Sequence, residues 1–261
     1  MLCRDSGPVC NASHSDAGRQ IKIAPSKWIA IIKRVSPILY TMRKLFLDIE
    51  TLPAADENFE ALRLLHAKKK AKKKKEKDCE DTSNFEQYLL TTSFDGSFGR
   101  ILCIAYAIDD DPVEVLSGDG DEAGMLREFW RIVDSISVPS NGQWKDYGVQ
   151  FIGHNVMDFD LRFIYQRSII NRVRPAYEIS FARYRNYPVY DTMKEWTKWS
   201  SNNIGLEHIA LALGIPTPKD GIDGSEVYDF YKKGKVDDIC KYCKRDVEAT
   251  RAVYKRMTFE E

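Results

Sequence analysis

The chain has 261 residues, of which 43% are hydrophobic and 30% are charged, a composition typical of a globular protein and not of a disordered or fibrous one. Basic and acidic residues balance at 39 each, so net charge alone indicates neither a nucleic-acid-binding protein nor an acidic tail. No run of 18 apolar residues is present, so the sequence predicts neither a membrane-spanning helix nor a membrane partner.

The first 41 residues differ from those that follow. Between Ala17 and Leu47 there is no acidic residue, while seven lysines and arginines supply positive charge. A basic, acid-free leader is compatible with an organelle targeting peptide. Because Met42 is followed at once by a strand-like run, we favour a poorly ordered upstream extension for residues 1–41 and assign the folded domain to residues 42–261.

Six cysteines are scattered through a chain that is too large for a disulfide framework. Cys240 and Cys243 form a CxxC pair, but no second pair accompanies them and they fall inside a helical pattern. We therefore expect reduced, structural cysteines and a cytoplasmic protein.

From residue 43 onward, short apolar runs and helix-like periodicity follow one another along the chain. The first run is nearly continuous and ends in carboxylates, as expected of a buried central strand. Strands are predicted over 44–49, 100–108, 113–117, 149–155 and 189–191, and helices over 122–136, 158–170, 206–213, 227–232 and 236–257. This order indicates an α/β fold with a mixed central sheet, three early strands plus two parallel strands, flanked by helices on both faces.

Residues 53–99, between the first two strands, are polar and rich in lysine, which predicts an insertion in the domain with one helical stretch near 57–77. The lysine run within it, 68–77, holds eight lysines and one glutamate. Charges this dense repel one another, so we expect a solvated, mobile segment and not a stable isolated helix. A polycation tethered to an acidic body would recruit phosphates; the alternative is a passive surface loop.

Two carboxylates end the first predicted strand. Asp48 and Glu50 are two residues apart, so their side chains point to the same face of the strand. Two close carboxylates repel each other unless a cation holds them. The pair therefore indicates a metal site, or alternatively it caps the loop that follows.

Further acidic candidates come later in the chain. Asn155 and Asp160 follow the fourth strand, at the carboxyl edge where ligands gather in α/β sheets. Asp158 has the simpler interpretation of a first-turn helix residue that the helix dipole favours. Tyr242 and Asp246, four residues apart, share one face of the last helix, although a tyrosine there is also compatible with a core position.

Taken together and in this order, the motifs DxE, NxxxFD and YxxxD resemble the DEDDy branch of the DEDD superfamily of 3′–5′ exonucleases. The histidine branch of that superfamily would need a histidine where Lys241 stands. The stretches 206–216, 219–227 and 242–254 resemble the predicted 3′–5′ exonucleases related to the proofreading domain of family-B DNA polymerases. The resemblance covers roughly residues 42–257, without the lysine-rich insertion.

The resemblance implies a ribonuclease H-like fold and hydrolysis of phosphodiester bonds from the 3′ end with two divalent cations, Mg²⁺ or Mn²⁺. It implies that the metal ligands are Asp48, Glu50, Asp160 and Asp246. Tyr242 would orient the attacking water together with Glu50. The implied contacts to the terminal nucleotide are Asn155, Thr51, Leu52 and Phe159.

The implied partner is a single-stranded 3′ end, DNA in preference to RNA, with DNA replication or repair proteins as further candidates. Arginines and aromatic residues alternate between Gln166 and Tyr190, which suits phosphate contacts and base stacking or, alternatively, a solvated loop; they are Arg167, Arg172, Arg174, Tyr177, Phe181, Arg183, Tyr184, Arg185 and Tyr187. Asp191 either supports the site or caps a helix. The alternative functions are an RNA-trimming, ribonuclease D-like exonuclease and a non-catalytic nucleic-acid-binding module; the match over 219–224 favours the polymerase relatives.

Overall fold

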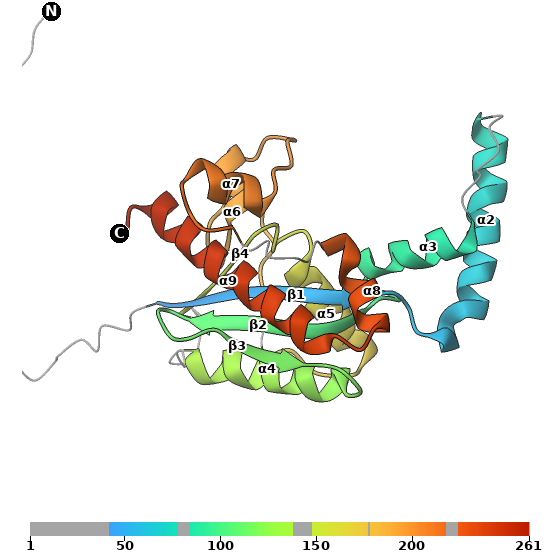
Figure 1. Ribbon diagram of the computed structural model, residues 1–261, viewed down its shortest axis with the longest axis horizontal. Coiled ribbons are helices and arrows are strands. Elements are labelled where there is room, and N and C mark those ends of the chain that lie inside the picture. The colour runs from blue at the N-terminus through green and yellow to red at the C-terminus, as the bar shows by residue number, and fades with distance from the viewer. Residues whose placement is uncertain (1–41, 78–83, 138–147, 177, 218–223, 261) are drawn as a thin grey trace, which may run out of the picture. The chain divides into compact units, whose positions relative to one another are not determined.

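The computed structural model describes residues 42–77, 84–137, 148–176, 178–217 and 224–260 (Figure 1). The expected N-terminal extension and most of the stretch 219–224 lie outside the described residues. The strands form one sheet of order β3-β2-β1-β4-β5. Their bounds are β1 Arg43–Leu52, β2 Arg100–Ile108, β3 Glu114–Ser117, β4 Val149–Gly153 and β5 Val189–Asp191.

The sheet is mixed. β1 pairs with β2 and β2 with β3 in antiparallel fashion, whereas β1 pairs with β4 and β4 with β5 in parallel. This confirms the predicted α/β sheet of three early strands plus two parallel strands. β1 therefore lies at the centre, with neighbours on both sides, which explains why its sequence is an almost continuous apolar run.

Helices flank the sheet. Their bounds, with short 3₁₀ turns marked η, are η1 Asp56–Asn58, α2 Phe59–Lys77, α3 Phe85–Thr91, η2 Thr92–Phe94, α4 Glu122–Ile136, α5 Asp160–Ile170, α6 Thr192–Thr197, α7 Leu206–Ala212, η3 Gly224–Glu226, α8 Val227–Lys232 and α9 Val236–Thr258. The predicted helices are all present. The sequence did not predict α3 and gave no bounds for α6, because helices of seven and six residues are too short to show a period.

The two faces of the sheet are covered by different helices. Leu45, Leu47 and Ile49 of β1 belong to a core shared with α4 and α5, including Phe129 and Phe163. The intervening residues of β1 point the other way, toward α9, which crosses the opposite face of the sheet (Figure 1). Strand alternation thus turns Asp48 and Glu50 toward α9.

The lysine run is helical: α2 continues through it to Lys77, which confirms the helical stretch predicted near 57–77, although the run was not expected to form a stable helix in isolation. The physical reason is that α2 is not isolated, because α3 packs against it. The His66 ring stacks on Tyr88 with centroids 4.8 Å apart, and the Arg63 guanidinium lies 4.6 Å from the centre of the Phe85 ring. These contacts anchor the first turns of α2 and extend helical structure into the charged region.

Among the described residues, none of the helices has both the length and the apolar character needed to cross a membrane.

Candidate active site

Four carboxylates from three elements converge beside the end of β4. Asp48 and Glu50 lie on β1, Asp160 begins α5 and Asp246 lies on α9. Their proximity is visible in their electrostatics, because the charges of Asp246 and Asp160 raise the pKa of both Asp48 and Glu50. The structure therefore brings together all four predicted metal-ligating residues.

Asp160 is held in place by the backbone of β1. The pairing of β1 with β4 ends at Phe46, which lies opposite Ile152, so the next part of β1 has no strand partner on that side. There the backbone N–H of Ile49 donates a hydrogen bond of 3.0 Å to Oδ1 of Asp160, whose side chain is buried. The shortness of β4 thus creates the gap that the carboxylate fills.

Burial and mutual repulsion dominate the electrostatics of this cluster. Burial, followed by the neighbouring carboxylates, raises the pKa of Asp48 and Glu50 well above their ordinary values. Burial likewise raises the pKa of Asp160 to about 7, although the backbone N–H of Ile49 opposes the rise. A set of close, buried carboxylate oxygens is the donor chemistry that Mg²⁺ and Mn²⁺ prefer, so the residues present fit divalent cations.

Cys243, which the sequence analysis did not single out for the site, borders the cluster. Its thiol donates to Oδ2 of Asp48 at 3.3 Å, and its Sγ and carboxylate oxygens of Asp48 and Glu50 lie within 4.8 Å of one another. Burial raises the pKa of this thiol well above its ordinary value, so it remains a protonated donor. The sequence signal that could have placed Cys243 at the site is its position three residues before Asp246, on the same helical face.

Tyr242 packs in the core and also contacts a carboxylate of the site. Its ring packs with the buried side chains of Leu52 and Leu102, and its exposed fraction is 8%. Its hydroxyl forms a hydrogen bond with Asp246. Burial and the adjacent carboxylates raise its pKa, so the phenol stays protonated and can direct a hydrogen bond within the site.

A mainly apolar cavity of about 520 Å³ opens next to Glu50. Of the predicted substrate contacts, Thr51 and Phe159 line this cavity. Leu52 does not, because its side chain is only 2% exposed and is packed in the core. Asn155 does not line it either.

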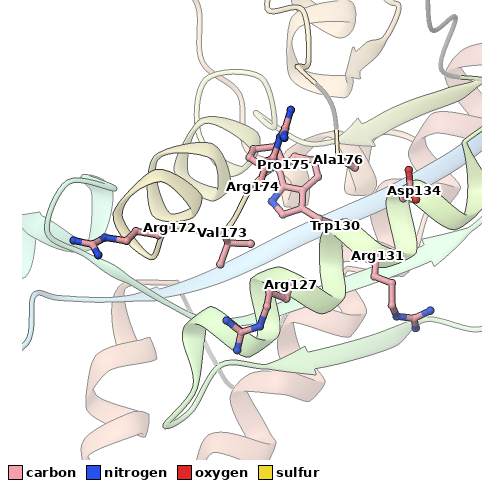
Figure 2. Close-up of a pocket in the computed structure, with 9 residues that line it drawn as sticks. All are labelled: Arg127, Trp130, Arg131, Asp134, Arg172, Val173, Arg174, Pro175 and Ala176. Carbon is pink, nitrogen blue, oxygen red and sulfur yellow. The ribbon is translucent and has the colours of Figure 1, made fainter. Parts of the chain in front are cut away.

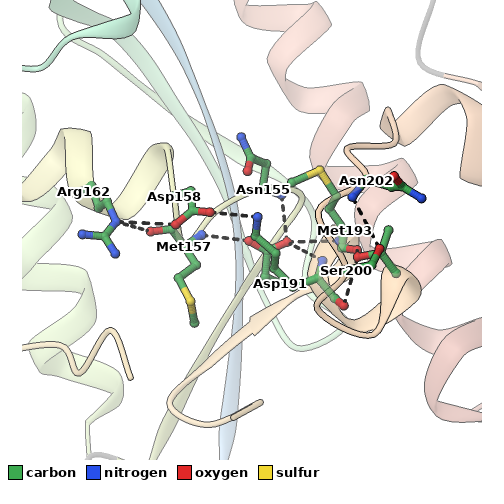
Figure 3. A network of polar contacts seen from close by, with 10 residues as sticks. Asn155, Met157, Asp158, Arg162, Asp191, Met193, Ser200 and Asn202 are labelled. Atoms are coloured by element: carbon green, nitrogen blue, oxygen red, sulfur yellow. Dashed lines mark hydrogen bonds and ion pairs between the residues drawn. The ribbon is translucent and has the colours of Figure 1, made fainter. Parts of the chain in front are cut away.

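Asp191 organises the polar network behind the site (Figure 3). Its buried carboxylate accepts four backbone N–H groups at 3.0–3.2 Å, those of Asn155, Met157, Met193 and Lys194. The first two belong to the turn that leads from β4 into α5, and the last two begin α6. Asp191 therefore does both things that the sequence left open: it caps a helix and holds the segment that precedes Asp160.

Two nearby side chains have structural roles. Asp158 lies before α5 and not in its first turn, contrary to the expectation, and it pairs with Lys194 at 2.8 Å and with Arg162 at 3.8 Å (Figure 3). The ring of His154 contacts Thr192 Oγ1 and the Ile204 carbonyl, and burial lowers its pKa to about 4. His154 is therefore neutral at physiological pH.

The group of arginines expected to hold phosphates is not a single surface. Arg167 is buried and forms two hydrogen bonds with Glu122 on α4, at 2.9 and 2.7 Å, so it is not available to a nucleic acid. Arg172 and Arg174 line a different pocket of about 480 Å³, in which Arg172 and Arg131 point in opposite directions (Figure 2). This pocket follows the C-terminal end of α5, whereas Asp160 is at its start, so it is separate from the carboxylates.

Comparison with known proteins identifies the class to which this fold and site belong. A family described as predicted 3′–5′ exonucleases related to the exonuclease domain of PolB matches residues 97–261. The chain belongs to this family, and its class is therefore that of 3′–5′ exonucleases. This confirms the relationship inferred from the motifs.

Two individual proteins are similar to this chain. An uncharacterised protein of Methanocaldococcus jannaschii is 25% identical over 176 residues, which span 63% of this chain and 89% of that protein. Among solved structures, the family B DNA polymerase of the hyperthermophilic archaeon Pyrobaculum calidifontis superposes with a TM-score of 0.55 and 17% identity. The match covers 83% of this chain but only 24% of the polymerase, so it supports the fold of one part of that enzyme.

The family match includes Asp160, Tyr242 and Asp246 but begins after β1, which carries Asp48 and Glu50. The matched region alone would therefore lack two of the four carboxylates. Asp48 and Glu50 nevertheless lie beside the other two carboxylates, because β1 pairs with β2 and β4 inside the same sheet.

The carboxylate of Asp191 generates a prediction about stability. Asp191→Ala leaves four backbone N–H groups without their acceptor and should lower the free energy of unfolding by about 3 kcal/mol. Asp158→Ala, in the same network but partly exposed, is the matched control and should cost about 1 kcal/mol or less. Urea unfolding of the three proteins measures both values; equal losses would contradict the special role of Asp191.

Proposed function

We propose that the protein removes nucleotides from single-stranded 3′ ends by hydrolysis of phosphodiester bonds, with two divalent cations, Mg²⁺ or Mn²⁺. The observation that carries this proposal is the convergence of Asp48, Glu50, Asp160 and Asp246 beside a cavity that Glu50 itself borders. DNA as the preferred substrate over RNA rests on the relationship with the PolB exonuclease domain. Residues 42–261 would form the catalytic domain.

The four carboxylates, Asp48, Glu50, Asp160 and Asp246, would hold the cations. Bound cations in such a site neutralise charge on the scissile phosphate and activate water. The chain's own contribution is the arrangement of oxygen donors: the backbone of Ile49 fixes Asp160, and the Cys243 thiol restrains Asp48. Because these supports are hydrogen bonds to single oxygens, they leave other carboxylate lone pairs for ligation.

Tyr242 and Glu50 would position the attacking water. The phenol of Tyr242 is protonated and restrained by Asp246, so it can donate to or accept from a water in one defined direction. The substrate's terminal nucleoside would occupy the adjoining cavity, whose volume lies in the range of small-molecule sites. Thr51 and Phe159 would contact it there.

The direct test is stepwise shortening of a 5′-labelled single strand. Purified protein with Mg²⁺ or Mn²⁺ should produce a ladder of shorter products, and EDTA should stop it. Asp246→Ala should abolish cleavage with the fold intact, and Tyr242→Phe should lower kcat by about 100-fold with little change in KM. Absence of products with either metal, on both DNA and RNA, would refute the proposal.

The same assay separates the alternatives. Matched DNA and RNA oligonucleotides give relative rates, and faster shortening of RNA would indicate a ribonuclease D-like enzyme. Binding of either strand without cleavage would indicate a non-catalytic module.

Cation binding should also be visible in the pH dependence of stability. Unfolded carboxyls titrate near pH 4, whereas Asp160 has a pKa of about 7 in the folded protein. The folded state therefore binds more protons between these values, and the stability of the cation-free protein falls as pH rises through this window. Bound Mg²⁺ would offset the repulsion between the ionised carboxylates of the cluster. It should therefore raise the Tm more at pH 8 than at pH 5.5.

Thermal unfolding with Mg²⁺ and with EDTA measures this difference without reliance on activity. Asp246→Ala should reduce the shift caused by Mg²⁺ at pH 8. A shift that is the same at both pH values would contradict carboxylate ligation.

We further propose that the lysine-rich part of α2 recruits the strand. Its described lysines Lys68, Lys69 and Lys72 are exposed, and the helix presents them at high density. Replacing the eight lysines of 68–77 by glutamine keeps helix propensity but removes the charge. Binding of long strands should weaken and its salt dependence become shallower, with kcat unchanged.

Affinity measured against salt concentration tests this, and replacement of the same lysines by arginine is the control that retains the charge. Superimposable plots for the glutamine variant and the unaltered protein would leave the lysine run without a role in binding.

A further inference from the structure

The segment between β1 and β2 contributes directly to the cavity beside the carboxylates. Four of the residues that line this cavity, Leu90, Thr91, Ser93 and Phe94, lie where α3 continues into η2. The lining also includes Val227 and Tyr228 at the start of α8. The supposed insertion therefore forms one wall of the candidate substrate site.

This wall is fixed to β1 immediately beyond Glu50. The hydroxyl of Thr51 donates to the Ser93 carbonyl at 2.7 Å, and the backbone N–H of Ala54 donates to Thr92 Oγ1 at 2.9 Å. Thr92 is buried, with 4% of its surface exposed. Because the partners, Thr51 at the end of β1 and Ala54 just after it, are one and four residues after Glu50, the position of the wall is tied to the position of the carboxylates.

Phe94 is more exposed than Leu90, the other large apolar residue of this wall. Its side chain is 74% exposed, although the adjoining lining is apolar. Its ring centroid lies 6.4 Å from that of Phe159, and Phe159 lies 5.6 Å from the buried ring of Phe163. The three rings form a series from the core to the solvent, and the outermost ring retains a large free surface.

An unpaired nucleobase has the chemistry to cover that surface. Bases present flat, apolar π-faces, and proteins bind single strands by stacking such faces on aromatic side chains. A base inside a duplex is covered by its neighbours and tied to its partner strand, so it must be unpaired before it can reach the ring.

From these observations we infer that Phe94 is a specificity-determining residue that stacks on a base within the last two nucleotides of an unpaired 3′ end. The inference rests on the proposed exonuclease function, which supplies the strand. It assigns substrate selection to the region between β1 and β2, because that region holds the outer aromatic wall against β1. Loss of the ring should weaken capture of single strands while leaving the carboxylates in place.

The test compares Phe94→Ala, Phe94→Leu and Phe94→Trp in the full chain. Phe94→Ala should raise KM for single strands about tenfold with kcat within about twofold, and should reduce the preference for single strands over paired ends. Phe94→Leu, which is apolar without a π-face, should behave like Phe94→Ala, whereas Phe94→Trp should retain tight binding. Phe259→Ala is the matched control, because Phe259 is 91% exposed at the end of α9 and should have no effect.

A second readout reports stacking itself. Fluorescence of 2-aminopurine at the 3′-terminal or the preceding position should be quenched on binding to Asp246→Ala, which leaves the strand uncut, and less quenched when Phe94→Ala is added. Unchanged KM and quenching for Phe94→Ala, or full function of Phe94→Leu, would overturn the inference. Quenching that depends on Phe94 in a protein that cleaves no strand would sustain the inference and overturn the exonuclease proposal instead.

Discussion

The structure depends on keeping four like charges close together in a place from which water is largely excluded. Burial and mutual repulsion both oppose ionisation of the four carboxylates, which are Asp48, Glu50, Asp160 and Asp246. The fold counters this by placing two of them on the central strand, where Asp48 and Glu50 are held by pairing with β2. The ionised cluster is therefore electrostatically unfavourable without cations, and bound divalent cations would offset the repulsion between its carboxylates.

Rigid support for the cluster comes from backbone amides more than from charged side chains. The N–H of Ile49 binds Asp160, and four further N–H groups bind Asp191, which fixes the turn before α5. Amides are neutral donors that cannot leave by changing rotamer, so they position a carboxylate without neutralising it. A lysine or arginine in the same places would compete with the cation for the carboxylates.

The region between β1 and β2 has two parts with different physical roles. α3 and η2 are fixed by hydrogen bonds to β1 and form a wall of the cavity next to Glu50. α2 contacts α3 through aromatic side chains in its first half, and its described lysines Lys68, Lys69 and Lys72 are exposed. A segment that almost entirely precedes the family match is thereby joined to the same site as the strand it follows.

The sequence by itself determined the elements whose signal is local. α4 has the predicted bounds because its apolar residues recur at helical spacing, and the DxE, NxxxFD and YxxxD spacings selected the four carboxylates and Tyr242 that the structure brings together. Tertiary structure alone decided the rest. The pairing of Arg167 with Glu122, the burial of Leu52 and the place of Phe94 at the cavity depend on contacts between residues far apart in the chain, and no local period or propensity encodes such contacts.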